Sequence, residues 1–121
     1  MPLAEPGLTR SARQQFARGR GGIRRARCYL SPIVLCELTW VLRDAYDQTR
    51  PSLLSTLDLL LSTRQFEIGD KDLVRDAIEA FRAGSADFAD YLIGATSRRD
   101  GCAETVTFDR RLRAAAGFRV L

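Results

Sequence analysis

Three short stretches decide the interpretation of this chain: SPIVLCELTWVL (Ser31–Leu42), ADFADYLIGA (Ala86–Ala95) and TFDRRL (Thr107–Leu112). Each stretch places one carboxylate beside apolar residues, and these carboxylates are Glu37, Asp90 and Asp109. An ionised carboxylate next to apolar sequence is costly unless a cation meets it. Three such groups therefore indicate a shared acidic pocket for a hard divalent metal ion.

Outward from these stretches, short apolar segments alternate with helical patterns. The predicted strands are Cys28–Leu30, Phe66–Ile68, Thr105–Phe108 and Phe118–Leu121. Helices are predicted to begin after a cap at Ser31, at Pro51, after a cap at Asp70, near Asp87 and at Asp109. This alternation predicts an α/β sandwich around a short parallel sheet.

The helical spacing also predicts which side chains are buried. In the first helix one face carries Val34, Leu38, Val41, Leu42 and Ala45. Glu37 borders that face, and a helix-edge ion pair is the simplest alternative explanation for it. In the third helix the predicted core face is Leu73, Val74, Ala77, Ile78 and Phe81.

The fourth helix carries two acids on one side. Asp87 and Asp90 are three residues apart, and Gly94 and Ser97 continue that side. Such a small and polar stripe is expected to leave room for a ligand. Because Asp87 is also well placed to cap the helix, we assign it a capping role and assign the functional role to Asp90.

Asp109 follows the strand that ends in Thr107 and Phe108. Ligands of open parallel sheets bind beyond the carboxyl ends of the strands, which is where Asp109 is expected to lie. Ser31 has the equivalent place after the earlier strand. Capping explains each residue alone, and only the joint arrangement favours a functional site.

Composition excludes several kinds of chemistry. The 121 residues include no histidine, which excludes Ser-His-Asp and Cys-His catalysis and most catalytic zinc sites. The three cysteines form no CxxC pair and no apolar run is long enough to span a bilayer, so we expect a cytoplasmic protein with reduced thiols. Seven arginines and one acid lie in residues 1–30, a basic balance that is weakly compatible with RNA as a partner.

The three stretches resemble the PIN domain, most closely the VapC-type toxin ribonucleases of bacterial toxin–antitoxin pairs, over about Arg27–Leu121. The matching residues are Ser31-Pro32-Ile33-Val34 with Glu37, Ala86–Ile93 and Thr107-Phe108-Asp109. The resemblance implies a three-layer α/β/α sandwich and metal-dependent hydrolysis of RNA phosphodiester bonds.

Roles for individual residues follow from the same resemblance. Glu37, Asp90 and Asp109 would hold Mg²⁺ or Mn²⁺, while Thr107 and Ser31 would orient carboxylates or water and Asp87 would assist. The resemblance also implies a homodimer, an RNA substrate, a cognate antitoxin protein and no association with a membrane.

The N-terminal part departs from the family pattern. A PIN domain begins with a hydrophobic central strand that ends in aspartate, and residues 1–27 contain no aspartate and no such strand. We therefore expect residues 1–27 to be a basic, poorly ordered segment, residues 28–121 to form the PIN-like domain, and activity to be weak or absent. The alternative is a catalytically inactive PIN-fold protein that retains antitoxin or partner binding.

Overall fold

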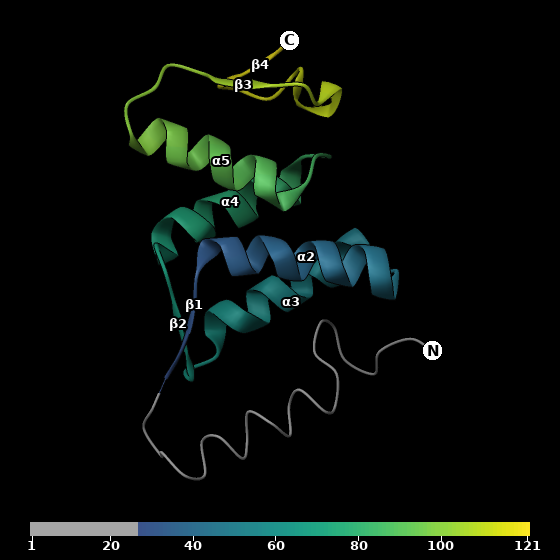
Figure 1. The fold of residues 1–121 in the computed structure, drawn as a ribbon, viewed down its shortest axis with the longest axis vertical. Coiled ribbons are helices and arrows are strands. Elements are labelled where there is room, and N and C mark those ends of the chain that lie inside the picture. The colour runs from purple at the N-terminus through teal and green to yellow at the C-terminus, as the bar shows by residue number, and fades with distance from the viewer. Residues whose placement is uncertain (1–26) are drawn as a thin grey trace. The chain divides into compact units, whose positions relative to one another are not determined.

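The computed structural model describes residues 27–121, and the predicted lack of order in residues 1–26 lies outside the described residues. The chain divides into two compact units, of which the first ends at Gly69 and the second spans Asp70–Leu121. The described residues form four α-helices, one 3-10 helix and four three-residue strands. The predicted α/β class is confirmed (Figure 1).

The first unit contains two strands and two helices, which are β1 (Cys28–Leu30), α2 (Pro32–Tyr46), α3 (Arg50–Ser62) and β2 (Phe66–Ile68). The strands run parallel, with Cys28 opposite Phe66 and Leu30 opposite Ile68. Figure 1 shows β1 leading directly into α2, and α2 packs against α3. Both predicted strands are therefore present, and they pair with one another.

Capping residues set the helix starts in this unit. The Ser31 hydroxyl accepts a hydrogen bond from the Val34 backbone N–H at 3.1 Å, as the sequence predicts, and Pro32 occupies the first helical position. Thr49 caps α3 in the same way through the Ser52 N–H, at 3.3 Å. The start of α2 therefore lies directly at the carboxyl end of β1.

The core face of α2 agrees with the predicted one at Leu42, and Leu38 is half-buried, but the rest of the face differs. Its buried residues are Leu35, Cys36, Thr39 and Leu42. Val34, Val41 and Ala45 are exposed instead. Apolar residues lie around most of α2. The helical spacing of the sequence therefore fits two neighbouring faces and does not single out the buried one. Glu37 is consequently exposed and does not border the buried side.

The second unit contains α4 (Lys71–Ala83), α5 (Phe88–Arg99), β3 (Thr105–Thr107), the 3-10 helix η1 (Arg110–Leu112) and β4 (Phe118–Val120). Helix α4 packs against α5, with the Phe81 and Phe88 rings in an edge contact at 6.1 Å between centroids. Four of the five predicted core residues of α4 are buried, and Leu73 is half-buried. Strands β3 and β4 are parallel, with Thr107 opposite Val120.

Two details of this unit correct the sequence interpretation. Asp70 precedes α4 as predicted, but its side chain makes no capping hydrogen bond, because its backbone has a left-handed φ of 49°. The space beside Gly94 is filled and does not accommodate a ligand. A Cβ at Gly94 would lie 2.5 Å from the Phe118 ring, so the small residue there permits β4 to pack on α5.

The described strands form two separate two-stranded parallel ladders, one in each unit. Each ladder ends, at its carboxyl side, in a residue that caps the following helix: Ser31 after β1 and Asp109 after β3. The sequence-predicted site residues at strand ends therefore lie where they were expected within their own units.

Candidate functional site

The carboxyl end of β3 positions Asp109. The Asp109 backbone N–H donates to Thr107 Oγ1 at 3.1 Å, and the Asp109 carboxylate accepts from the Arg111 backbone N–H at 2.9 Å. Leu112, which is 0% exposed, anchors the short η1 turn. The Thr107 side chain therefore contacts the backbone of Asp109 and not its carboxylate.

The start of α5 positions two further carboxylates. Asp87 is the N-cap residue, as the sequence predicted, and it forms a capping box with Asp90 at the third helical position. Asp90 Oδ2 accepts a hydrogen bond from the Asp87 backbone N–H at 3.2 Å. The preceding loop is fixed by Tyr91, whose hydroxyl accepts from the buried Ala86 N–H at 3.2 Å.

Arg111 joins these two segments. Its Nε lies 3.0 Å from both carboxylate oxygens of Asp109, and its Nη2 lies 2.6 Å from Asp109 Oδ2. Its Nη1 lies 3.6 Å from Asp87 Oδ1 and 3.4 Å from the Ser85 carbonyl oxygen. The guanidinium thus contacts residues from both the η1 turn and the loop before α5.

The electrostatics of the three carboxylates follow from this arrangement. Partial burial raises the pKa of Asp90 above its ordinary value, and the negative charges of Asp109 and Asp87 add to that rise. The hydrogen bonds from Arg111 lower the pKa of Asp109, and the same contact raises the pKa of Arg111 further. Of Asp90 and Asp109, Asp90 is therefore the one whose ionised form would gain more from a cation in addition to Arg111.

The chemistry of these side chains suits a hard cation, because all the donor atoms are carboxylate oxygens. Among residues 27–121, however, no group of three histidine, cysteine or acidic side chains is arranged to hold a metal ion. The second unit brings Asp87, Asp90 and Asp109 within electrostatic range of one another, and Arg111 engages two of them.

Glu37 and Ser31 belong to the first unit. Glu37 lies in α2 and is exposed, with the exposed side chains of Ile33 and Val41 one turn away on either side. Ser31 is half-buried, and its hydroxyl is engaged in capping α2. The structure therefore assembles four of the six predicted site residues, which are Asp87, Asp90, Thr107 and Asp109.

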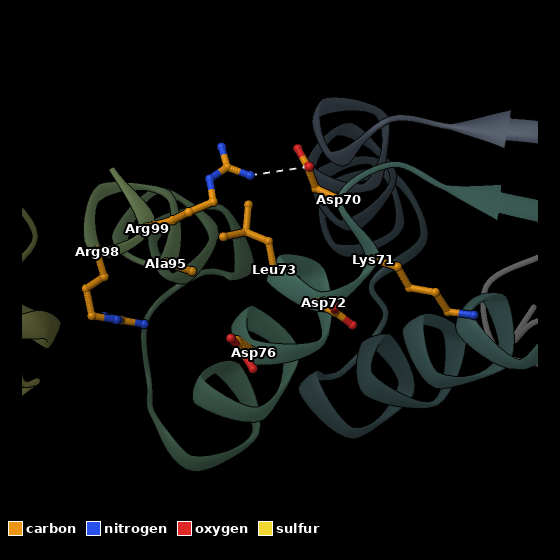
Figure 2. A pocket seen from close by; sticks show the side chains of 8 residues that line it. All are labelled: Asp70, Lys71, Asp72, Leu73, Asp76, Ala95, Arg98 and Arg99. Carbon is orange, nitrogen blue, oxygen red and sulfur yellow. Dashed lines mark ion pairs between the residues drawn. The ribbon is translucent and has the colours of Figure 1, made fainter. Parts of the chain in front are cut away.

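Two cavities lie in the second unit. The first, of about 530 Å³, lies between the start of α4 and the end of α5. Figure 2 shows Arg99 directed toward Asp70, with which it forms an ion pair at 3.3 Å, while Lys71 points away. Acidic and basic side chains both line this cavity, and none of the predicted site residues does.

The second cavity, of about 630 Å³, is lined mainly by small residues at the end of α4 and in the loop before β4. Arg111 and Arg98 contribute its cationic groups, and Tyr91 and Phe118 contribute aromatic rings in edge contact at 6.4 Å. Arg111 therefore borders both the acidic cluster and this cavity.

Sequence reasoning missed the role of Arg111. The residue was visible in the TFDRRL stretch, two positions after Asp109. A capping aspartate accepts a hydrogen bond from a backbone N–H two or three residues later, so the residue at that position has its side chain close to the carboxylate. An arginine there was a signal that the carboxylate carries its own counter-ion.

Comparison with known proteins agrees with this fold. The family model of the PIN domain matches residues 6–118. This chain belongs to the PIN domain family. The match extends further toward the N-terminus than the resemblance visible in the three stretches, and it includes every predicted site residue.

The PIN domain chain is 26% identical over 80 residues to a VapC ribonuclease from Aquifex aeolicus (strain VF5). The aligned region is 66% of this chain and 59% of that relative, so the chain spans less than two thirds of the relative's length. No solved structure matches. Within residues 27–121, no helix is long and apolar enough to cross a membrane.

Proposed function

We propose that this chain is a metal-dependent endoribonuclease toxin of a toxin–antitoxin system that hydrolyses RNA phosphodiester bonds. Membership of the PIN domain family and the similarity to a VapC ribonuclease support this proposal. The single observation that carries it is that Asp87 and Asp109, from two segments of the second unit, both contact Arg111, with Asp90 within electrostatic range of both.

The proposed metal ligands are the carboxylates of Glu37, Asp90 and Asp109. Bound Mg²⁺ or Mn²⁺ would polarise the phosphate and provide an activated water. Asp90 supplies a carboxylate whose pKa is raised mainly by partial burial and further by the negative charges of Asp109 and Asp87. Asp109 supplies a carboxylate held by the Thr107 and Arg111 backbone contacts.

Asp87, Thr107 and Ser31 have supporting roles in this proposal. Asp87 fixes the Asp90 carboxylate through its backbone N–H, at 3.2 Å. Thr107 fixes the peptide of Asp109, at 3.1 Å. Ser31 sets the start of α2 and hence the position of Glu37 along that helix. Such outer contacts orient the groups that bind a metal ion.

The test is cleavage of a single-stranded RNA by the purified full chain with Mg²⁺, with Mn²⁺ or with a chelator. We expect cleavage with either metal and none with the chelator. Asp90→Asn, Asp109→Asn and Glu37→Gln are each expected to abolish cleavage, because each removes one charge from the site and keeps the side-chain volume. The three variants are expected to remain folded.

Glu79→Gln is the matched control, because Glu79 is an exposed acid that pairs with Arg82 on the surface of α4. It should cleave at the wild-type rate. Cleavage that survives Glu37→Gln but not Asp90→Asn would remove Glu37 from the site. Cleavage that survives Asp90→Asn would contradict the proposal.

A second candidate is a catalytically inactive PIN-fold protein that still binds an antitoxin or another partner. One observation favours it: both oxygens of Asp109 are already engaged by Arg111. Under this candidate, a candidate antitoxin binds the chain in isothermal titration calorimetry, and RNA remains intact with every metal. Under the first candidate, the same antitoxin suppresses measurable cleavage.

The proposal includes a cytoplasmic location, an RNA substrate, a cognate antitoxin and a homodimer. The dimer is tested by light scattering coupled to size-exclusion chromatography, where a mass of twice 13.5 kDa is expected. A single monomeric species over the accessible concentration range would contradict it.

A further inference from the structure

The two cavities of the second unit differ in the charges along their walls. Their volumes, about 530 and 630 Å³, are both within the range of small-molecule sites. Three acidic and three basic side chains line the first cavity, so its charges balance. The residues that line the second cavity include two arginines and no acid. The second cavity is therefore complementary in charge to an anion.

The two arginines of the second cavity differ in how far their charge is already used. Arg111 contacts Asp109 and Asp87, so two carboxylates offset its charge. Within residues 27–121, the exposed Arg98 guanidinium forms no ion pair and no hydrogen bond. Arg98 Nη1 lies over the backbone of Gly117, where an added Cβ would be 3.7 Å away. Arg98 is therefore the cation that is left to meet an anionic ligand.

An aromatic ring lies next to this cation in the wall of the same cavity. Phe118 follows Gly117 directly, lines the cavity and is half-buried, so part of its ring is accessible. The ring is held in place by its edge contact with Tyr91 and by its close approach to Gly94. Most of the remaining wall consists of alanines from the end of α4 and the loop before β4. This part of the cavity can receive a planar, mainly apolar group.

An accessible ring beside an uncommitted guanidinium matches the chemistry of a nucleotide. Proteins that bind single-stranded RNA stack bases on aromatic side chains and contact phosphates with arginine. An acidic peptide would also be attracted to Arg98, but it carries no planar ring for the space beside Phe118. The combination of groups therefore favours RNA over an acidic peptide.

We propose that the second cavity binds one nucleotide of a single-stranded RNA, with its phosphate on Arg98 and its base against Phe118. This inference rests on the proposed function, in which RNA is the substrate. Arg111 borders both this cavity and the acidic cluster. The bound nucleotide therefore lies near the phosphodiester bond that the proposed site cleaves, and the cavity positions the strand.

The test is binding of a short, fluorescein-labelled single-stranded RNA to the full chain, measured by fluorescence anisotropy in the presence of a chelator. Arg98→Gln should weaken binding by about five-fold and reduce the slope of log affinity against log salt by about 0.7, the value for one lost phosphate contact. Phe118→Leu keeps an apolar side chain and should weaken binding by about ten-fold, the scale of one lost base stack.

Arg99→Gln is the matched control for Arg98→Gln. Arg99 is the next residue of α5 and its replacement changes the net charge equally, but it pairs with Asp70 at 3.3 Å and lines only the first cavity. Figure 2 draws both arginines and marks an ion pair for Arg99 alone. Arg99→Gln should bind RNA within two-fold of the wild-type affinity and keep the wild-type salt slope.

A second variant avoids both proposed contact residues. Ala114 is exposed and lines the second cavity, so Ala114→Glu places an acid there and should weaken RNA binding at least five-fold. Ala103→Glu, at an exposed position outside both cavities, is its control and should stay within two-fold of the wild type. Far-ultraviolet circular dichroism checks the fold of each variant. If Arg98→Gln or Phe118→Leu does not fold, this pair decides the matter.

Equal weakening by Arg98→Gln and Arg99→Gln would overturn the inference, because net charge alone would then explain the effect. A labelled oligoglutamate that binds in an Arg98-dependent way, beside RNA binding that is independent of Arg98, would assign the cavity to an acidic peptide and also overturn it. Cleavage of RNA with metal but no binding that depends on the cavity would overturn the inference and leave the proposed function standing. Binding that depends on Arg98 without cleavage under any metal would support the nucleotide subsite and contradict the proposed function.

Discussion

The ends of β1 and β3 have the same design and differ in one chemical group. Each strand has three residues, pairs in parallel with one neighbour and is followed within two residues by a capping side chain. After β1 the cap is the neutral hydroxyl of Ser31, and the helix that follows has 15 residues. After β3 the cap is the carboxylate of Asp109, and the helix that follows is the single turn of η1.

The difference between Ser31 and Asp109 distinguishes a side chain that only caps a helix from one whose charge has a further role. A hydroxyl is sufficient to cap a long helix that carries its own buried face. The η1 turn is too short to need a charged cap, yet its cap is an aspartate that lies within electrostatic range of Asp90 and binds the side chain of Arg111. We infer that the charge at the end of β3 serves the acidic cluster more than the turn.

The largest expected change in the free energy of unfolding comes from the buried residues that hold each capped helix in place. Helix α2 is held by four buried residues, whereas η1 has Leu112 as its one buried residue among the described positions. Leu112→Ala should therefore cost about 2–5 kcal/mol of unfolding free energy, measured by chemical denaturation. Leu59→Ala is the control, because Leu59 is 39% exposed and its truncation should cost far less. Equal losses in both variants would show that η1 is not anchored through Leu112.

A smaller effect is expected at the neutral cap. Ser31→Ala removes the acceptor of the Val34 N–H and should lower the free energy of unfolding by about 1 kcal/mol. Ser31→Asp should restore most of that loss, because a carboxylate is also a good cap. Ser55→Ala, at an exposed position inside α3, serves as the control and should be neutral or slightly stabilising. A neutral Ser31→Ala variant would mean that packing alone defines the start of α2.

The sequence was sufficient to predict the elements and the caps other than Asp70, but not the buried face of α2 or the charge partners. Ser31, Asp87 and Asp109 were found because capping depends on neighbouring backbone groups. The core face of α2 was misassigned because Val34 and Val41 belong to an apolar stripe that the fold leaves exposed. Gly94 was misread because the Phe118 ring that covers it lies 24 residues away in the sequence.

Asp109, the charged cap, predicts how the stability of the protein depends on pH. Because Arg111 lowers the pKa of Asp109, the ionised carboxylate favours the folded state above the ordinary value of 3.8. This contribution is lost as the pH falls through the lowered pKa. Asp109→Asn should be less stable than the wild type at neutral pH, and the two should converge on acidification, as measured by thermal unfolding across that range.

Glu104→Gln is the control for that measurement, since Glu104 pairs with Arg119 on the surface at 3.0 Å and both side chains are largely exposed. Its stability should follow the wild type at every pH. A constant deficit of Asp109→Asn, independent of pH, would assign the loss to the altered cap and not to the ion pair.

The smallest expected change in stability is at Asp90, and its sign is opposite to that expected at Asp109. Burial and the neighbouring acids raise the pKa of Asp90, so its charged form is less favourable in the folded chain than in the unfolded chain. Asp90→Asn should therefore slightly stabilise the protein at neutral pH, and the wild type should recover the difference as acid protonates Asp90. Thermal unfolding of Asp90→Asn beside Asp109→Asn measures both signs in one series. A carboxylate that destabilises its own fold fits the proposed function, in which a bound metal ion would supply the missing stabilisation. A lower stability of Asp90→Asn at neutral pH would show that the capping box, and not a demand for a cation, explains the position of Asp90.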